Sequence, residues 1–240
     1  MINIKIFTLF PEIFHSYLKS SILGRALEKK LWNYEAINIR DYSKEKHKHV
    51  DDVPFGGGSG MVMNPEVVAN ALDSNCNKQT TKFYYMSPRG KILNQKMVNS
   101  IISNKEIAII CGRYEGIDQR VIDEYNMEEI SIGDFVLTGG ELPALSMIDC
   151  CIRCIDGVLS GESSLENESF GGNNDSQYNN LLEHPLYTQP RIWRNKNVPE
   201  VLLSGHHKNI EKWKLDEAQK ITQERRPDLW QKYNESNKNK

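Results

Sequence analysis

Apolar and polar positions in residues 1–155 follow two alternating periods. Short runs rich in Ile, Tyr and Phe predict strands, and apolar residues at helical spacing predict that the segments between them are helices. The predicted strands are 2–7, 34–39, 82–87, 106–111 and 128–132, and the third should end at Pro88. The predicted helices are 12–31, 65–72, 93–102, 117–125 and 142–155. Strands that alternate with helices predict an α/β fold with a mainly parallel sheet covered on both faces.

The pattern changes near residue 160. Residues 160–180 are polar and rich in Asn, Ser and Gly, which is typical of a flexible linker. Beyond them a helix is predicted that Pro227 should end. The apolar residues on one face of this helix are Ile210, Trp213, Ala218 and Ile221. The chain is therefore predicted to have two domains, 1–160 and a small helical domain at 185–240, joined by a linker over 161–184.

Composition and charge narrow the class of protein. With 240 residues, 39% of them hydrophobic and 26% charged, the chain has a globular composition. No apolar run approaches the roughly 18 residues of a membrane span. The N-terminus lacks the basic start and cleavage site of a signal peptide, so we expect a cytoplasmic protein that does not contact membranes. The net charge of −2 excludes a globally basic nucleic-acid binder, although 44–49 and 206–226 are locally basic.

Three cysteines cluster at Cys150, Cys151 and Cys154. They lack a second pair at zinc-finger spacing, which favours small buried side chains over a metal or redox role. We predict no metal-binding residues in the protein.

Glycine is densest in DDVPFGGGSGM at 51–61. A pattern G-x-x-x-x-G-K-[ST] or G-x-G-x-x-G that starts at Gly56 needs a glycine five residues later, where Met61 stands, so neither phosphate-binding pattern is present. Three more loops follow predicted strands: MSPRG (86–90), CGRYEG (111–116) and IGDFVLTGGELP (132–143). Because ligands bind at the carboxyl ends of parallel strands, these three loops are predicted to form one binding site.

Four segments together resemble the signature blocks of the bacterial tRNA (guanine-N1)-methyltransferases: DDVPFGGGSGM, CGRYEGID, SIGDFVLTGGELPA and LLEHPLYTQP. The resemblance continues through LLSGHHKNI and RRPDLW and covers nearly the whole chain. It implies methyl transfer from S-adenosylmethionine to N1 of guanosine 37, the nucleotide 3′ of the anticodon in tRNA. It also implies a requirement for Mg²⁺, for which the sequence shows no compact carboxylate cluster.

The same resemblance implies an unusual fold and assembly. The family belongs to the SPOUT methyltransferases, whose sheet contains a deep trefoil knot that general topology rules would reject. Its members work as homodimers with both active sites at the subunit interface. Domain 1–160 would then bind the methyl donor, 161–184 would carry the catalytic acid, and 185–240 would bind tRNA.

Individual roles also follow from the resemblance. Glu168, where the family more often has Asp, is expected to be the general base for the N1 proton, and Arg153 to stabilise negative charge on O6. Contacts with the substrate are expected from Asp51, Gly58, Ser164 and Glu183. The residues expected to bind S-adenosylmethionine are Tyr85, Met86, Ser87, Pro88, Gly112, Tyr114, Glu115, Ile132, Gly133, Asp134, Phe135, Val136, Leu137, Gly139, Gly140 and Pro143.

Other interpretations apply to the same residues. Arg153 lies four residues after Asp149, the spacing of an exposed helical ion pair, and Glu168 is one of several acids in a polar segment.

The chain departs from the family in the longer segment GGNNDSQYNN and in Gln189, where Arg is common. RNA is expected on the basic surface at 44–49 and on the C-terminal helices, mostly through phosphates. The rival functions are a non-catalytic RNA-binding module and a nucleotide-dependent enzyme that uses GGGSG as a phosphate loop.

Overall fold

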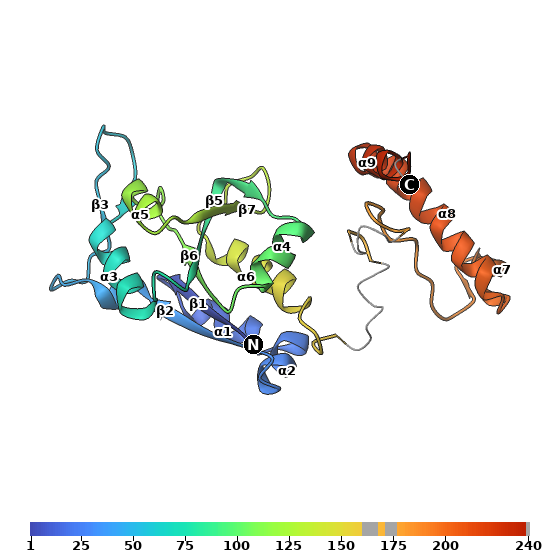
Figure 1. Cartoon of the computed structure of the whole chain (residues 1–240), viewed down its shortest axis with the longest axis horizontal. Helices are drawn as coiled ribbons and strands as arrows, with labels where there is room; N and C mark the ends of the chain where they lie inside the picture. Colours follow the sequence, from blue (N-terminus) through green and yellow to red (C-terminus); the bar gives the residue numbers. More distant parts are fainter. Residues whose placement is uncertain (160–167, 171–176, 239–240) are drawn as a thin grey trace. The chain divides into compact units, whose positions relative to one another are not determined.

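The computed structural model describes residues 1–159, 168–170 and 177–238, and the chain divides into two compact units, Met1–Leu159 and Ser160–Lys240 (Figure 1). The first unit contains two clusters of buried apolar residues and the second unit contains one. Much of the predicted linker 161–184 lies outside the described residues.

The first unit is built on a five-stranded sheet in which every pair of neighbouring strands is parallel, as predicted. The strand order is β2-β1-β6-β5-β7. The strands are β1 (Ile2–Thr8), β2 (Trp32–Asn38), β5 (Lys82–Ile92), β6 (Glu106–Cys111) and β7 (Glu128–Ser131). Because β6, β5 and β7 are neighbours, the loops at their carboxyl ends lie next to one another.

Helices cover both faces of this sheet, because alternate residues of the central strands are apolar on both sides. In β6, Ile107 and Ile109 belong to one buried cluster, whereas Ala108 and Ile110 belong to the other. The helices of the first cluster are α1 (Glu12–Leu18), α2 (Ser21–Glu28), α4 (Gln95–Ile102) and α6 (Glu141–Ile152). Those of the second are α3 (Pro65–Asn75) and α5 (Gln119–Glu124) (Figure 1).

The single helix predicted over 12–31 is wrong, because the chain forms two helices there. Ser20 has extended backbone angles (φ −98°, ψ 156°) and Ser21 has φ +50°, which breaks the helical hydrogen bonding between α1 and α2. Gly24 permits this tight junction, since a Cβ on it would lie 2.1 Å from the Lys19 carbonyl oxygen. Neither the glycine nor the serines stand out from the helical apolar pattern in the sequence.

The prediction that the third strand ends at Pro88 is also wrong. Pairing between β5 and β6 ends at Met86, and pairing between β5 and β7 shifts register between Met86 and Lys91. Pro88 falls inside that irregularity, where its missing N–H breaks no ladder. Gly90 brings the two backbones together, because a Cβ there would lie 2.4 Å from the Glu129 carbonyl carbon.

The first unit also contains a short hairpin and a 3-10 turn that were not predicted. The glycine-rich segment 51–61 lies between β3 (Asp51–Asp52) and β4 (Val62–Met63), which pair antiparallel and make it a hairpin. The strand predicted over 34–39 stops at Asn38, whose side chain accepts a hydrogen bond from the Arg40 N–H and caps a 3-10 turn, η1 (Ile39–Tyr42).

The second unit has a small core in which Tyr178 and Leu181 pack with Ala218. Its regular elements are β8 (Ile192–Trp193), β9 (Lys196–Asn197), α7 (Glu200–Leu203), α8 (His207–Arg225) and α9 (Pro227–Lys238). The predicted end of the helix near Pro227 is confirmed, because α8 stops at Arg225 and Pro227 opens α9. Among the described residues, no helix combines the length and apolarity needed to cross a membrane.

Candidate active site

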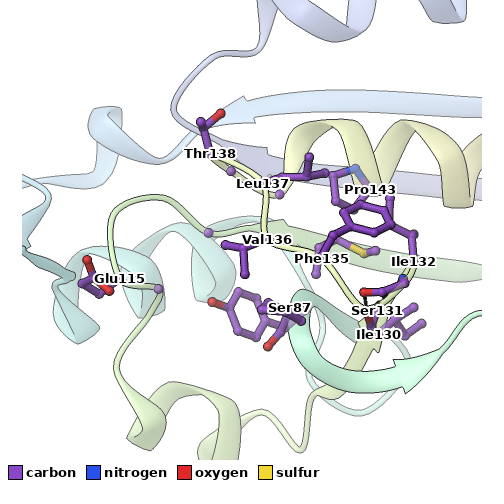
Figure 2. A pocket seen from close by; sticks show the side chains of 18 of the residues that line it. Ser87, Glu115, Ile130, Ser131, Ile132, Phe135, Val136, Leu137, Thr138 and Pro143 are labelled. Carbon is purple, nitrogen blue, oxygen red and sulfur yellow. Dashed lines mark hydrogen bonds between the residues drawn. The ribbon is translucent and has the colours of Figure 1, made fainter.

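The loops that follow β5, β6 and β7 enclose a cavity of about 230 Å³ (Figure 2). Its lining residues are Tyr85, Met86, Ser87, Pro88, Gly112, Tyr114, Glu115, Gly116, Ile130, Ser131, Ile132, Gly133, Phe135, Val136, Leu137, Thr138, Gly139, Gly140 and Pro143. Every residue predicted to bind the methyl donor lines this cavity except Asp134, which is exposed. The predicted convergence of three strand exits is therefore confirmed as geometry.

Four lining residues were not predicted: Gly116, Ile130, Ser131 and Thr138. Gly116 and Thr138 lie inside the loops predicted to form the site, and extending the third loop by two residues toward the N-terminus would have found Ile130 and Ser131. Ser131 fixes the third loop locally, because its hydroxyl donates to the Gly133 carbonyl oxygen (3.0 Å) and lies 3.2 Å from the Gly133 N–H.

Glycines let the three loops approach one another closely. A Cβ on Gly112 would lie 2.8 Å from the Tyr85 hydroxyl, and one on Gly140 would lie 2.7 Å from the Cys111 Cα. The Gly140 N–H donates to the Gly112 carbonyl oxygen at 2.9 Å. Side chains at these positions would fill the cavity or separate the strand exits.

One wall of the cavity is apolar, although it lies on the surface of the unit. Phe135, Val136 and Leu137 are 53%, 83% and 40% exposed. In Figure 2, Phe135 lies with Ile132 beside Pro143, and Glu115 stands at the opposite end. The cavity therefore offers an apolar face at one end and a carboxylate at the other. Burial raises the pKa of the Tyr85 phenol, which stays neutral at physiological pH.

A buried ion pair holds the third loop against the sheet. Glu141, at the start of α6 and only 2% exposed, accepts hydrogen bonds from Thr8 Oγ1 (2.8 Å) and Arg113 Nε (3.2 Å) on its Oε1. Arg113 Nη2 lies 3.0 Å from Oε2, and Nη1 donates to the Thr138 carbonyl oxygen at 3.3 Å. The guanidinium carbon also lies 4.5 Å from the centre of the Phe10 ring.

This ion pair joins the ends of β1 and β6 to the start of α6. Thr8, Arg113 and Glu141 were all missed by sequence reasoning. The only available signal was that Arg113 and Glu141 stand within the glycine-containing loops.

The glycine hairpin is bonded to the cavity loop that follows β6. The Glu115 N–H donates to the Met61 carbonyl oxygen, and the Met63 N–H donates to the Gly116 carbonyl oxygen, both at 2.9 Å. Of the residues predicted to contact the substrate, Asp51 pairs with Met63 at the base of the hairpin, and Gly58 (φ +117°) lies in the loop between its strands. The hairpin is therefore held beside the cavity loop by backbone hydrogen bonds.

The two predicted catalytic residues belong to different units. Arg153 directly follows α6, and its N–H donates to the Asp149 carbonyl oxygen at 3.1 Å. It comes ten residues after Pro143, which at 1.5 Å per helical residue places it about 15 Å along the helix axis from that cavity residue. The Asp149 carboxylate accepts a hydrogen bond from the Tyr17 hydroxyl.

Glu168 is half-buried and lies in a segment that is bonded to the rest of the second unit. The Ser169 hydroxyl accepts from the Glu183 N–H at 2.9 Å, so the structure brings two predicted acidic residues into neighbouring segments. The Leu182 N–H in turn donates to Thr222 Oγ1 of α8 at 2.8 Å. Ser164, also predicted to contact the substrate, lies outside the described residues.

The metal-ligand residue types are dispersed in the part of the chain that the structure describes. No three His, Cys, Asp or Glu side chains there are close enough to hold a metal ion together. The clustered cysteines are free thiols, and Cys151 is buried. Burial raises the pKa of the Cys150 and Cys151 thiols, which favours their neutral forms.

Comparisons with known proteins agree with one another over nearly the whole chain. A family profile described as tRNA (Guanine-1)-methyltransferase TrmD matches residues 2–232. The tRNA (guanine-N(1)-)-methyltransferase of Ruminiclostridium cellulolyticum is 51% identical over 229 residues, which are 95% of each chain. The proteins of that name from Wolbachia pipientis wMel and Rickettsia akari are 48% and 47% identical over 230 residues, covering 95% of this chain and 94% and 97% of the relatives.

Proposed function

Because this chain belongs to the tRNA (guanine-1)-methyltransferase TrmD family, we propose that it transfers a methyl group from S-adenosylmethionine to N1 of guanosine 37 in tRNA. Family membership makes the chain a methyltransferase. The donor, the nucleotide position and the residue roles are the proposal. The observation that carries it is the cavity at the exits of β5, β6 and β7.

Three features of the cavity support S-adenosylmethionine as the donor. The loops expose backbone N–H and C=O groups at glycine positions, which can bind an adenine edge and ribose hydroxyls. Phe135, Val136 and Leu137 supply apolar surface for the purine ring. No lining residue is Lys or Arg, which suits a molecule without phosphate. When bound, S-adenosylmethionine supplies an electrophilic methyl group on a sulfonium.

The protein's own residues would handle the proton and the charge on guanine. Glu168 accepts the proton from N1, which a base at neutral pH removes only when it is positioned against that atom. Arg153 donates hydrogen bonds to O6, where negative charge develops as the proton leaves. Glu183 is held in the segment next to Glu168 and is assigned to binding the nucleotide. Asp51 and Gly58 of the glycine hairpin are assigned to the same substrate.

A homodimer completes this proposal. Arg153 lies about 15 Å along α6 from Pro143, which is farther than an arginine side chain extends. Arg153 therefore fits the cavity of a second copy better than its own. The close contact of Gly140 with β6 supports the knotted SPOUT topology, in which the segment before α6 passes the strand exits. We assign the protein to the cytoplasm, where it would meet tRNA.

Methyl transfer to an unmodified tRNA transcript tests this function. We expect the full chain to methylate a transcript with guanosine 37 and to leave one with adenosine 37 unmodified, with the product identified as 1-methylguanosine by nucleoside mass spectrometry. Calorimetry should show binding of S-adenosylmethionine but not of ATP or NAD. Equal methylation of the two transcripts, or methylation at another guanine atom, would contradict the proposed reaction.

A further inference from the structure

The second unit carries an exposed hairpin whose residues have no individual role in the proposed reaction. β8 and β9 pair through Ile192 with Asn197 and Trp193 with Lys196, and every residue of 191–197 is exposed. Trp193 is 55% exposed and Ile192 is 64% exposed. We call residues 191–197 the hairpin surface.

The hairpin surface has a defined shape despite its exposure. Its two turn residues, Arg194 (φ +49°) and Asn195 (φ +62°), are both left-handed, which is the geometry of a tight two-residue turn between antiparallel strands. The Val198 N–H closes its base by donating to the Arg191 carbonyl oxygen at 3.0 Å. An ordered turn holds its side chains in place before a partner arrives, which lowers the entropic cost of binding.

Charge on this surface is entirely positive. Arg191, Arg194 and Lys196 lie in a stretch with no Asp or Glu between Glu183 and Glu200. None of the ion pairs formed by the described residues involves these three cations. The cations are therefore available to an external anion.

An aromatic ring lies among these cations. The Arg194 guanidinium carbon lies over the Trp193 ring, 4.8 Å from its centre, so the cation packs against a face of the indole. Exposed aromatic rings between Arg and Lys side chains are the combination by which proteins bind unpaired nucleotides, with bases stacked on the rings and phosphates bound by the cations. A protein partner rich in acidic groups would satisfy the cations but would leave the indole surface without a matching planar group.

A cavity of about 230 Å³ adjoins the hairpin at Arg191. Thr188 and Gln189 line it and can both donate and accept hydrogen bonds. Tyr187, also in its lining, packs against Trp213 of α8 with ring centres 6.2 Å apart. Polar groups that suit a ribose or a base edge therefore stand next to the cationic and aromatic hairpin.

We propose that the hairpin surface is an RNA-binding subsite, in which Trp193 stacks on one unpaired base and Arg194 and Lys196 bind the adjoining phosphates. The subsite rests on the proposed function, which makes tRNA the substrate. It adds a hairpin to the C-terminal helices on which RNA was expected in this unit.

The test measures binding of an unmodified tRNA transcript to the full chain at several salt concentrations. Trp193→Ala should weaken binding about 10-fold, within the range typical for loss of one base–aromatic stack, whereas Trp193→Phe should stay within about threefold of wild type. Lys196→Ala should lower the slope of log affinity against log salt by about one. Arg25→Ala, which removes an exposed cation of α2 in the first unit, is the control and should leave the tRNA affinity unchanged.

Two further readouts distinguish the loss of an RNA contact from a general loss of folding. The affinity for S-adenosylmethionine should be the same in all these variants, and tRNA should quench wild-type tryptophan fluorescence more than that of Trp193→Phe. The subsite is refuted if Trp193→Ala binds tRNA within twofold of wild type. That result would assign the hairpin surface to a different partner, such as a protein. It is also refuted if Trp193→Ala loses donor affinity to the same extent. Failure of the wild-type chain to methylate tRNA would instead refute the proposed function.

Discussion

Glu168 is the residue that we propose as the general base, and its side chain is one methylene longer than that of aspartate. We expect Glu168→Gln to slow methyl transfer by about 10² or more, because the amide cannot take the N1 proton. Glu168→Asp keeps a carboxylate and should retain most of the activity. Single-turnover methylation with saturating donor measures the chemical step, and donor affinity serves as the control for folding. A rate for Glu168→Gln within about threefold of wild type would show that another group is the base.

A substitution at Gly140 tests close backbone approach without also straining the backbone conformation. Its φ of −81° suits any residue, but a Cβ would lie 2.7 Å from the Cys111 Cα. Gly140→Ala should therefore separate the loop from β6, lower the free energy of unfolding by about 1–3 kcal/mol and weaken donor binding at least tenfold. Chemical denaturation and calorimetry measure the two effects.

Gly57→Ala is the matched control for this prediction. Gly57 has φ +78° and open space around its Cβ position, so alanine there should cost about 1 kcal/mol and leave donor affinity unchanged. If both variants lost donor affinity equally, close packing at Gly140 would not be the cause.

At the scale of elements, the buried Arg113–Glu141 pair connects β6 to α6 and positions the loop that lines the cavity. Arg113→Ala leaves the Glu141 carboxylate buried with only Thr8, and we expect a loss of about 3 kcal/mol in the free energy of unfolding together with weaker donor binding. Removing both charges, with Arg113→Met and Glu141→Leu, should cost less than Arg113→Ala alone. The comparison uses denaturant unfolding of the single and double variants, and simple additivity of their effects would contradict a coupled pair.

How far each element could be predicted depended on where its stabilising contacts lie in the sequence. The prediction of β6 was correct because both faces of this strand are buried and five of its six residues are apolar. The β3–β4 hairpin was missed because strands of two residues show no periodicity. The cavity lining was predictable because loops after parallel strands meet at one edge. Its supporting ion pair was not, since Arg113 and Glu141 are 28 positions apart, and Thr8, which also donates to Glu141, is 133 positions away from it.

For the whole molecule, the position of Arg153 decides how many chains build one active site. The residue follows the last turn of α6, whereas Gly140 and Pro143 at the other end line the cavity. If the cavity of one chain uses Arg153 of another, a defective arginine and a defective cavity can be carried by different chains of one dimer without inactivating both sites. This property separates a shared site from two independent ones.

We expect a mixture of two inactive variants to recover activity. Arg153→Ala keeps an intact cavity, and Gly112→Val should abolish donor binding, because its side chain projects at the Tyr85 hydroxyl. In a mixed dimer the intact cavity of the Arg153→Ala chain meets the intact arginine of its partner. Random co-assembly of equal amounts should therefore give about a quarter of wild-type activity. Co-expression with two affinity tags yields the mixed dimer for direct assay. An inactive mixed dimer would place Arg153 in the site of its own chain, whereas wild-type activity of Arg153→Ala by itself would place Arg153 outside the chemistry.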